Sequence, residues 1–189
     1  MRNLILVRHS LPLIQPELPA SQWSLSDEGL RRAALLPALL APFKPPRILA
    51  SKELKAQQTA QVITQALKLP LGIEIGLHEH ERPQAAGLNS REQFETQLSA
   101  FFEHPDRLIF GSESADEAYL RFSGTLDRLI KTYPHESLVL VSHGTVISLF
   151  VSRRCGVAPF HFWKQLGLPS IIVLSLPGFQ LQFVIESIQ

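Results

Sequence analysis

The chain has 189 residues, enough for one domain with a buried core, and 45% of them are hydrophobic while 19% are charged. These proportions are typical of a globular protein and exclude a disordered chain. The 18 basic and 17 acidic side chains give a formal net charge of +1, which argues against nucleic acid or an anionic membrane surface as the main partner.

The sequence also indicates where the protein works. Cys155 is the only cysteine, so no disulfide can form within the chain, which fits a reducing compartment. Arg8 and His9 interrupt the apolar N-terminus, which therefore does not resemble a signal peptide. No stretch approaches the roughly 20 apolar residues that span a bilayer. We expect a cytoplasmic protein with no membrane partner.

Apolar strands and amphipathic helices alternate along the chain. In chain order we predict a strand at 3–7, a helix from Ser26 that weakens near Pro37 and ends before Pro42, a strand at 47–50, a helix at 51–67, a strand at 71–75, helices at 90–102 and 114–133, a strand at 138–142, a helix at 145–154, and strands at 170–176 and 180–185. This alternation predicts an α/β protein, a three-layer α/β/α sandwich with a largely parallel central sheet.

Helix caps and loop composition refine this outline. Ser26 is a good N-cap, and capping boxes are expected from Ser90 with Gln93 and from Ser114 with Glu117. Residues 77–89 contain glycine, proline and charged residues and should form a loop. We predict a single domain over 1–189, in which 83–110 form a lid or side wall.

Aromatic residues in the 83–110 segment have a helical spacing. Phe94, Leu98, Phe101 and Phe102 fall on one face of the expected helix, and we expect them to pack against the core.

Two histidines stand directly after predicted strands that are far apart in sequence. His9 follows Arg8 at the end of the first strand, and His143 follows Ser142 at the end of the strand over 138–142. Ligands of open α/β sheets bind at the carboxyl ends of the strands. Two imidazoles and one guanidinium can therefore meet in one place, which suits a nucleophile inside an anion-binding site.

Four sequence blocks, spread over most of the chain, resemble those of the histidine phosphatase superfamily, which has the phosphoglycerate mutase-like fold. Arg8-His9-Ser10 resembles the Arg-His-Gly signature of the family, and Leu25-Ser26 with Gly29 resembles its Leu-Thr-x-x-Gly helix start. Residues 51–60 resemble its Ser-x-x-x-Arg-Ala-x-Gln-Thr-Ala helix. Ser142-His143-Gly144 resembles the block that holds its second histidine. The blocks follow the order of the family, and they indicate a phosphatase-type member of branch 1.

The resemblance implies a metal-independent phosphatase that hydrolyses phosphate monoesters without a cofactor. His9 would attack phosphorus as a neutral imidazole and form a phosphohistidine, which water then hydrolyses. Arg8 and His143 would hold the phosphoryl oxygens, joined by Ser10 and by the helix start at Gly144, whose N–H groups and dipole favour an anion. The near-neutral charge fits a small phosphorylated metabolite as the partner, and a phosphoprotein or phosphohistidine substrate is the alternative.

The resemblance also implies a general acid, a glutamate in a Leu-x-Glu context after the third strand. Leu77-His78-Glu79 matches that context, so Glu79 is the expected acid, and Glu81 is the alternative two residues on. Histidines and carboxylates from His78 to Glu81 are also metal-ligand types. We favour a polar loop with one working acid over a metal site.

The sequence departs from the family at several positions. Lys55 replaces the arginine that grips phosphate, so the charge is kept but the two-pronged fork is lost. We expect Lys55 to bind phosphate as a flexible point charge, and Lys52 is the neighbouring alternative. Ser10 replaces a glycine, and Pro12 and Gln15 replace a serine and an asparagine of mutase-type members. The alternatives to hydrolysis are a phosphomutase of the same family and a phospho-ligand binding module without turnover.

A basic-aromatic cluster near the C-terminus is expected to be a solvated edge of the molecule. Its members are Arg153, Arg154, His161, Trp163 and Lys164.

Overall fold

A six-stranded sheet forms the centre of the computed structural model, which describes residues 2–82 and 90–189. The strands are β1 (Arg2–Arg8), β2 (Ile48–Ser51), β3 (Leu71–Glu74), β4 (Leu138–Ser142), β5 (Ser170–Leu176) and β6 (Gln180–Ile185). Their order is β3-β2-β4-β1-β5-β6, and the first four of these are mutually parallel. Strand β5 pairs in antiparallel fashion with both β1 and β6. The predicted, largely parallel sheet is confirmed.

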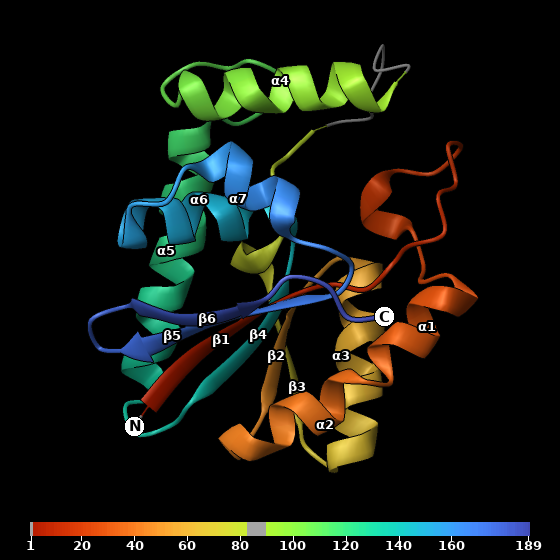
Figure 1. The fold of residues 1–189 in the computed structure, drawn as a ribbon, viewed down its shortest axis with the longest axis vertical. Helices are drawn as coiled ribbons and strands as arrows, with labels where there is room; N and C mark the ends of the chain where they lie inside the picture. Colours follow the sequence, from red (N-terminus) through yellow and green to blue (C-terminus); the bar gives the residue numbers. More distant parts are fainter. Residues whose placement is uncertain (1, 83–89) are drawn as a thin grey trace.

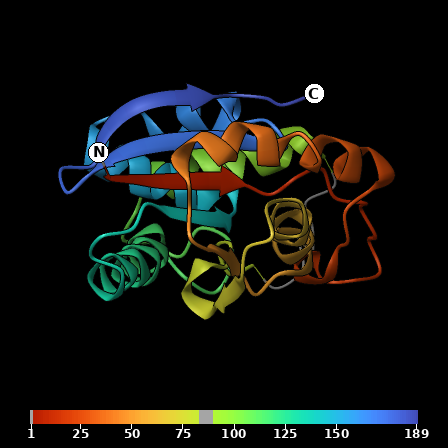
Figure 2. The same cartoon turned by 90° about the horizontal axis from the view of Figure 1, so that it is seen from below.

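Helices cover both faces of this sheet (Figures 1 and 2). One face carries α1 (Asp27–Ala33), α2 (Leu36–Leu40) and α3 (Leu54–Leu67). The other carries α5 (Ala115–Thr132) and α6 (Gly144–Cys155), with α7 (Pro159–Gln165) and α4 (Arg91–Glu103) beyond them. Three 3₁₀ turns complete the fold: η1 (Ala20–Gln22), η2 (Ala41–Phe43) and η3 (Ile75–Leu77). The molecule is thus the expected α/β/α sandwich.

Alternation along the strands divides the core into two layers. In β1, Leu4 and Leu6 face the layer of α5 and α6, while Ile5 and Val7 face the layer of α1 to α3. All four side chains are fully buried. A strand that is covered on both faces reads as a continuous apolar run, and this explains why β1 and β4 were recognisable without a polar face.

Most predicted helix starts are confirmed by their caps. The hydroxyl of Ser26 accepts from the Gly29 N–H, that of Ser90 accepts from Gln93, and Ser114 forms a complete capping box with Glu117.

The prediction of one weakened helix up to Pro42 was wrong in detail. That segment forms α1 and α2 with a break at 34–35, and Pro37 stands in the first turn of α2. Proline lacks the N–H that an interior helical position must donate, whereas the first turn has no use for it. The break therefore precedes the proline.

Two further boundaries differ from expectation. Ser51 ends β2 instead of beginning the next helix, and α3 starts at Leu54. Helix α7 was not predicted, although Pro159 occupies its first turn, a position that favours proline. At seven residues, α7 is too short for a clear apolar period.

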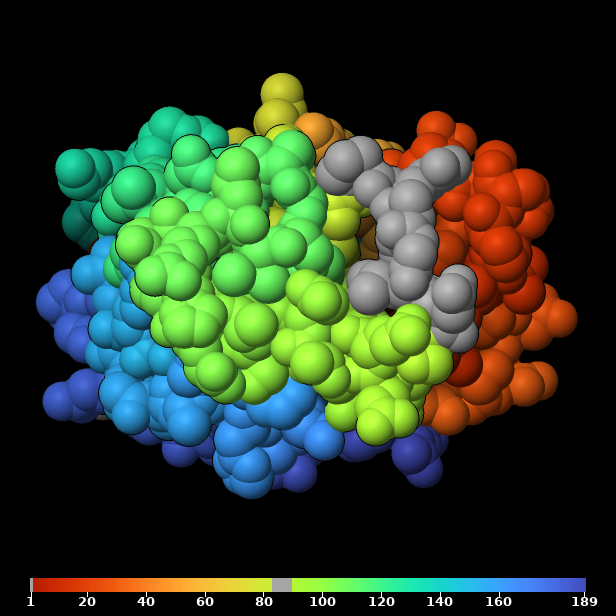
Figure 3. Space-filling view, turned by 90° about the horizontal axis from the view of Figure 1, so that it is seen from above, coloured from red at the N-terminus to blue at the C-terminus, as the bar shows by residue number. Residues whose placement is uncertain are grey.

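The segment predicted as a lid or side wall begins with 83–89, which lie outside the described residues. Its remainder contains α4, which lies across the top of the molecule next to α7 (Figures 1 and 3). Leu98, Phe101 and Phe102 are buried as expected, and Phe94 is partly buried. In the described part of the chain, no helix is long and apolar enough to cross a membrane.

The two-layer core predicts a large difference between two neighbours on α5. Phe122 is fully buried and its ring lies edge-on to Phe150 at 5.9 Å, whereas Leu120 is 66% exposed. Phe122→Ala should lower the free energy of unfolding by about 3–5 kcal/mol, because it leaves a cavity. Leu120→Ala should change it by less than about 0.5 kcal/mol. Urea unfolding of both variants tests this, and equal losses would contradict the assignment of the core.

Candidate active site

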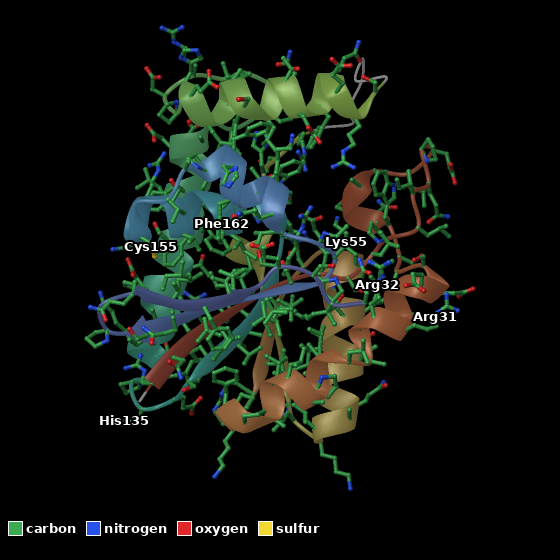
Figure 4. All side chains as sticks on the ribbon, viewed as in Figure 1. Arg31, Arg32, Lys55, His135, Cys155 and Phe162 are labelled. Carbon is green, nitrogen blue, oxygen red and sulfur yellow. The ribbon has the colours of Figure 1, made fainter. Side chains whose placement is uncertain are left out.

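Parallel pairing of β1 with β4 brings the two strand-end histidines together. Arg8 is in register with Ser142, and the N–H of His9 donates to the Ser142 carbonyl at 2.9 Å. The ring centroids of His9 and His143 lie 5.1 Å apart. The meeting of the two imidazoles and the guanidinium of Arg8 follows directly from this register. In Figure 4, Lys55 lies on the right of the view with Arg32, and His135 lies at the opposite end of the sheet.

His9 is buried as a neutral imidazole with one free nitrogen. Its Nδ1–H donates to its neighbour's carbonyl, that of Ser10, at 2.7 Å, which leaves the lone pair on Nε2. Burial, and then the nearby His143, Lys55 and Arg8, hold the pKa of His9 well below its usual range. The ring is therefore uncharged at neutral pH and has the tautomer that a nucleophile needs.

His143 presents a hydrogen-bond donor to the same place. Its Nε2 shares a hydrogen bond with the Ser51 hydroxyl at 2.8 Å, and the tautomer in which the hydroxyl donates has the proton on Nδ1. That Nδ1 is buried and has no partner among the residues described. Burial is the main reason why the pKa of His143 falls to about 4, so the donor is uncharged at neutral pH.

Arg8 is a half-buried cation whose Nε–H is buried and unpaired within the described chain. Its Nη1 donates to the Leu166 carbonyl. Burial lowers the pKa of Arg8 to about 10, so it stays charged. Gly144 allows this placement, because a Cβ there would lie 2.9 Å from both Cζ and Nε of Arg8.

Trp163 corrects the interpretation of the basic-aromatic cluster. A Cβ on Gly144 would lie 3.1 Å from its indole Nε1, and Cζ of Arg8 is 5.7 Å from the ring centroid. Trp163 is half-buried against the ring of Phe94, at 5.9 Å between centroids. It belongs to the wall of the site rather than to a solvated edge, whereas the other four members of the cluster are exposed as expected.

Glu79 lies beside the histidines and caps α6. Its carboxylate accepts from the N–H of Thr145 at 3.1 Å and of Val146 at 3.3 Å, which are the groups expected to be free for an anion. Burial by itself raises the pKa of Glu79, but Arg82 and the backbone N–H groups of His80 and Thr145 outweigh it and lower the pKa to about 2. Glu79 is therefore ionised in the ligand-free protein.

The remaining acid and the two loop histidines point elsewhere. Glu81 is half-exposed and pairs with Nε2 of His78 at 3.0 Å. His80 lies against the Phe101 ring, and its Nε2 is 3.0 Å from the Glu113 carbonyl. In residues 2–82 and 90–189, no three His, Cys, Asp or Glu side chains are grouped to hold a metal ion. The geometry favours Glu79 over Glu81 as the acid of the site.

Lys55 is buried in an ion pair that the sequence did not reveal. Its Nζ donates to Glu53 Oε2 at 2.5 Å and to the Ala20 carbonyl at 2.7 Å, and both side chains of the pair are 7% exposed. The other carboxylate oxygen of Glu53 accepts the Glu79 N–H at 2.7 Å and lies 3.5 Å from Nε2 of His143. Lys52, the alternative to Lys55, is exposed.

Glu53 lies in the 51–60 block, at a position where the family motif specifies no residue type. Burial opposes its charge, but Lys55 and the backbone N–H of Glu79 hold the pKa of Glu53 at about 2. The sequence signal for a buried ion pair here is a charged residue between two stretches that are expected to be buried.

Ser10 joins three of the sequence blocks. Its hydroxyl donates to the Gly29 carbonyl at 2.7 Å, and its N–H donates to the Thr59 hydroxyl at 3.0 Å. A Cβ on Gly29 would lie 2.0 Å from the Leu11 carbonyl oxygen, so only glycine fits at this contact. Ser10 thus fixes the loop after β1 to α1 and α3, and its role as a phosphate ligand remains a prediction.

Arg82 is a site residue that sequence reasoning missed. Its Nη2 lies 3.8 Å from Glu79 Oε2, and its Nη1 is buried without a partner in the described residues. Thr145 Oγ1 is unpaired in the same way. With Arg8 Nε and His143 Nδ1, the site holds four buried polar groups whose hydrogen bonds are unmade, and such groups are costly unless a ligand satisfies them. Beside a neutral histidine, they define a site for an anion with several acceptor oxygens.

This chain belongs to the histidine phosphatase superfamily, branch 1, whose family model matches residues 4–185. The fold is accordingly the phosphoglycerate mutase-like fold that the sequence blocks implied.

The chain is similar to several characterised or solved proteins. It is 29% identical over 164 residues to the metal-independent phosphoserine phosphatase of Arabidopsis thaliana, covering 80% of this chain and 68% of that protein. It is 24% identical over 135 residues to the uncharacterised phosphatase PhoE of Bacillus subtilis, covering 71% and 66%. The aligned region thus spans about two thirds of these curated relatives. A mycobacterial glucosyl-3-phosphoglycerate phosphatase, solved with VO3, superimposes with a TM-score of 0.74 at 18% identity over 96% of each chain.

The buried Lys55–Glu53 pair should behave as one energetic unit. Lys55→Met leaves an unpaired buried carboxylate and should lower the free energy of unfolding by about 3–5 kcal/mol. Lys55→Met combined with Glu53→Gln should lose clearly less than the sum of the two single changes. Urea unfolding of the four proteins measures this coupling.

The exposed pair of Arg31 with Glu28 provides the matched control, because its side chains are 73% and 39% exposed. The same double-mutant cycle should give a coupling of at most about 1 kcal/mol there. Additive losses at Lys55 and Glu53 would contradict the pairing.

Proposed function

We propose that this chain is a metal-independent phosphatase that hydrolyses phosphate monoesters through a phosphohistidine at His9. The observation that carries the proposal is the state of His9: a buried, neutral imidazole whose Nε2 lone pair is free. It lies beside the unpaired donors of Arg8 and His143. Phosphoryl transfer needs little more from a protein than a placed nucleophile and donors for the equatorial oxygens.

In the first step, Nε2 of His9 attacks phosphorus, the N–P bond forms and the bond to the leaving oxygen breaks. Nε of Arg8 and Nδ1 of His143 donate to the phosphoryl oxygens, where charge develops. The carbonyl of Ser10 accepts the Nδ1–H of His9 and stabilises the charge that the ring gains. Lys55 lowers the pKa of His9, and it is held in place by its ion pair with Glu53.

The leaving oxygen needs a proton, and Glu79 is ionised in the free protein. A phosphate monoester has a second pKa of about 6, so at mildly acidic pH its monoanion brings a proton into the site. Glu79 passes this proton to the leaving oxygen. In the second step, Glu79 takes a proton from the attacking water, the P–O bond forms and the P–N bond breaks. Glu79 then gives this proton to the departing phosphate, which restores the ionised Glu79 and the neutral His9.

The substrate is, by this proposal, a small phosphorylated metabolite. Two similar proteins carry names of that kind, a phosphoserine phosphatase and a glucosyl-3-phosphoglycerate phosphatase. A phosphomutase is less well supported, because Pro12 and Gln15 replace the mutase-type serine and asparagine. A binding module without turnover is disfavoured, because the carboxylate of Glu79 next to bound phosphate would oppose simple binding.

Removal of the nucleophile should abolish turnover. His9→Ala should lower kcat for p-nitrophenyl phosphate by more than about a thousandfold, because no neighbouring group can replace Nε2. The assay is run with a chelator present, so that a metal-dependent contaminant does not contribute. His135→Ala is the matched control, since His135 is exposed at the far end of the sheet and should keep full activity. Near-normal turnover by His9→Ala would contradict the mechanism.

Loss of the acid should depend on the leaving group. Glu79→Gln should lower kcat/KM by about 10²- to 10⁴-fold for an alkyl phosphate, whose alkoxide needs a proton. The loss should be much smaller for p-nitrophenyl phosphate, whose leaving group departs as a stable anion. Glu81→Gln is the matched control, and it should affect both substrates little. Equal losses on the two substrates would assign Glu79 a structural role as the cap of α6.

The pH dependence of kcat/KM in the wild type provides a further test of the mechanism. In the wild type, kcat/KM should fall as pH rises above about 6, where the substrate loses its proton. Protonation of His9 should not lower it near neutral pH, because burial holds the pKa of His9 well below its usual range.

A further inference from the structure

Position 55 does not supply a forked cation to the site. The Nζ of Lys55 has two of its three protons committed, to Glu53 and to the Ala20 carbonyl. The carboxylate of Glu53, 2.5 Å away, also offsets its charge. A lysine in this state acts as a distant point charge and cannot grip two oxygens at once.

Arg82 has the chemistry that Lys55 lacks, and it lies next to the proposed acid. Its Nη2 is 3.8 Å from Glu79 Oε2, which is longer than a hydrogen bond. Its Nη1 is buried and unpaired in the part of the chain that the structure describes. A guanidinium that is mostly buried and incompletely paired is unfavourable unless an anion completes it.

Aromatic rings hold this guanidinium in place. Cζ of Arg82 lies 4.8 Å from the ring centroid of Phe94 on α4 and 5.8 Å from that of Phe110. The two rings meet edge-on at 5.9 Å, and Phe94 also contacts Trp163, which adjoins Arg8. Stacked in this way, the fork loses little further freedom when it binds.

The unpaired donors converge around the carboxylate of Glu79. Glu79 accepts from the backbone of Thr145, whose Oγ1 is unpaired, and Thr145 follows Gly144, against which Arg8 packs. Arg82 lies 3.8 Å from Oε2 of Glu79, the same oxygen that accepts from Thr145, and its charge acts to lower the pKa of Arg8. An anion that satisfies Arg8 is therefore within reach of Arg82 as well.

We propose that Arg82 is the second guanidinium that holds the transferred phosphoryl group, in place of the arginine that the sequence blocks lead one to expect at position 55. This inference rests on the proposed function for the meaning of the bound group, but it concerns binding and not turnover. Phosphate would be held between Arg8 and Arg82, with Lys55 and Glu53 as a neutral pair behind it. Arg82 thereby becomes a residue that contacts substrate.

The test measures binding of inorganic phosphate by calorimetry, without turnover. Arg82→Gln should weaken the Kd about tenfold or more, because a charge-assisted fork is lost. Arg82→Lys should restore only part of the affinity. Arg91→Gln is the matched control, because Arg91 is 85% exposed on α4, and it should bind like the wild type.

A further variant separates the two cations. Lys55→Met with Glu53→Gln removes the pair without changing net charge, and it should weaken phosphate binding less than Arg82→Gln does. Thermal unfolding of every variant shows that each is folded before binding is compared. A larger loss from the pair than from Arg82 would overturn the inference.

Three other results would also overturn it. The first is an unchanged phosphate affinity in Arg82→Gln, and the second is a wild type that binds no phosphate at millimolar concentration. The third is an effect of Arg82→Gln that is seen only in the turnover of substrates with acidic leaving groups. The last result would place Arg82 on the leaving group. Failure of the proposed hydrolysis is seen separately, as full turnover in His9→Ala, and would leave the phosphate measurements interpretable.

Discussion

The parallel pairing of β1 with β4 is the constraint on which the rest of the site depends. One backbone hydrogen bond, from the N–H of His9 to the Ser142 carbonyl, continues the ladder past the end of β1 and sets the two imidazoles 5.1 Å apart. A slip of one residue would turn each side chain to the other face of the sheet. The apolar alternation on both faces opposes such a slip, so the packing of the core fixes the geometry of the chemistry.

Around the histidines, burial and charge are balanced by two carboxylates with separate duties. Glu53 neutralises Lys55 and accepts the N–H of Glu79, while Glu79 caps α6 and faces the site. Burial and the nearby cations keep His9 and His143 neutral, although the two ionised carboxylates act to raise the pKa of His143. The charge needed for an anion is therefore present without protonating the nucleophile, which is the condition for its reactivity at neutral pH.

Much of the fold could be predicted, because its signals are local. The strands are apolar runs, and serines with characteristic followers begin α1, α4 and α5. The errors also have local causes. The sequence predicts a single helix after Ser26 because the apolar pattern continues past residues 34–35. The structure has two helices there, because Pro37 requires a new first turn. Helix α7 was missed because seven residues carry too little periodicity.

The sequence by itself determined the sheet, the family and the motif residues His9, His143 and Arg8, since these follow from strand ends and fixed spacings. Only the tertiary structure decided which loop side chains join them. It placed Glu79 at the site and Glu81 outside it, and it buried Lys55 against Glu53. Arg82 and Trp163 reach the site through contacts between segments far apart in the chain. No spacing encodes such contacts, because they depend on how α4 and α7 pack above the sheet.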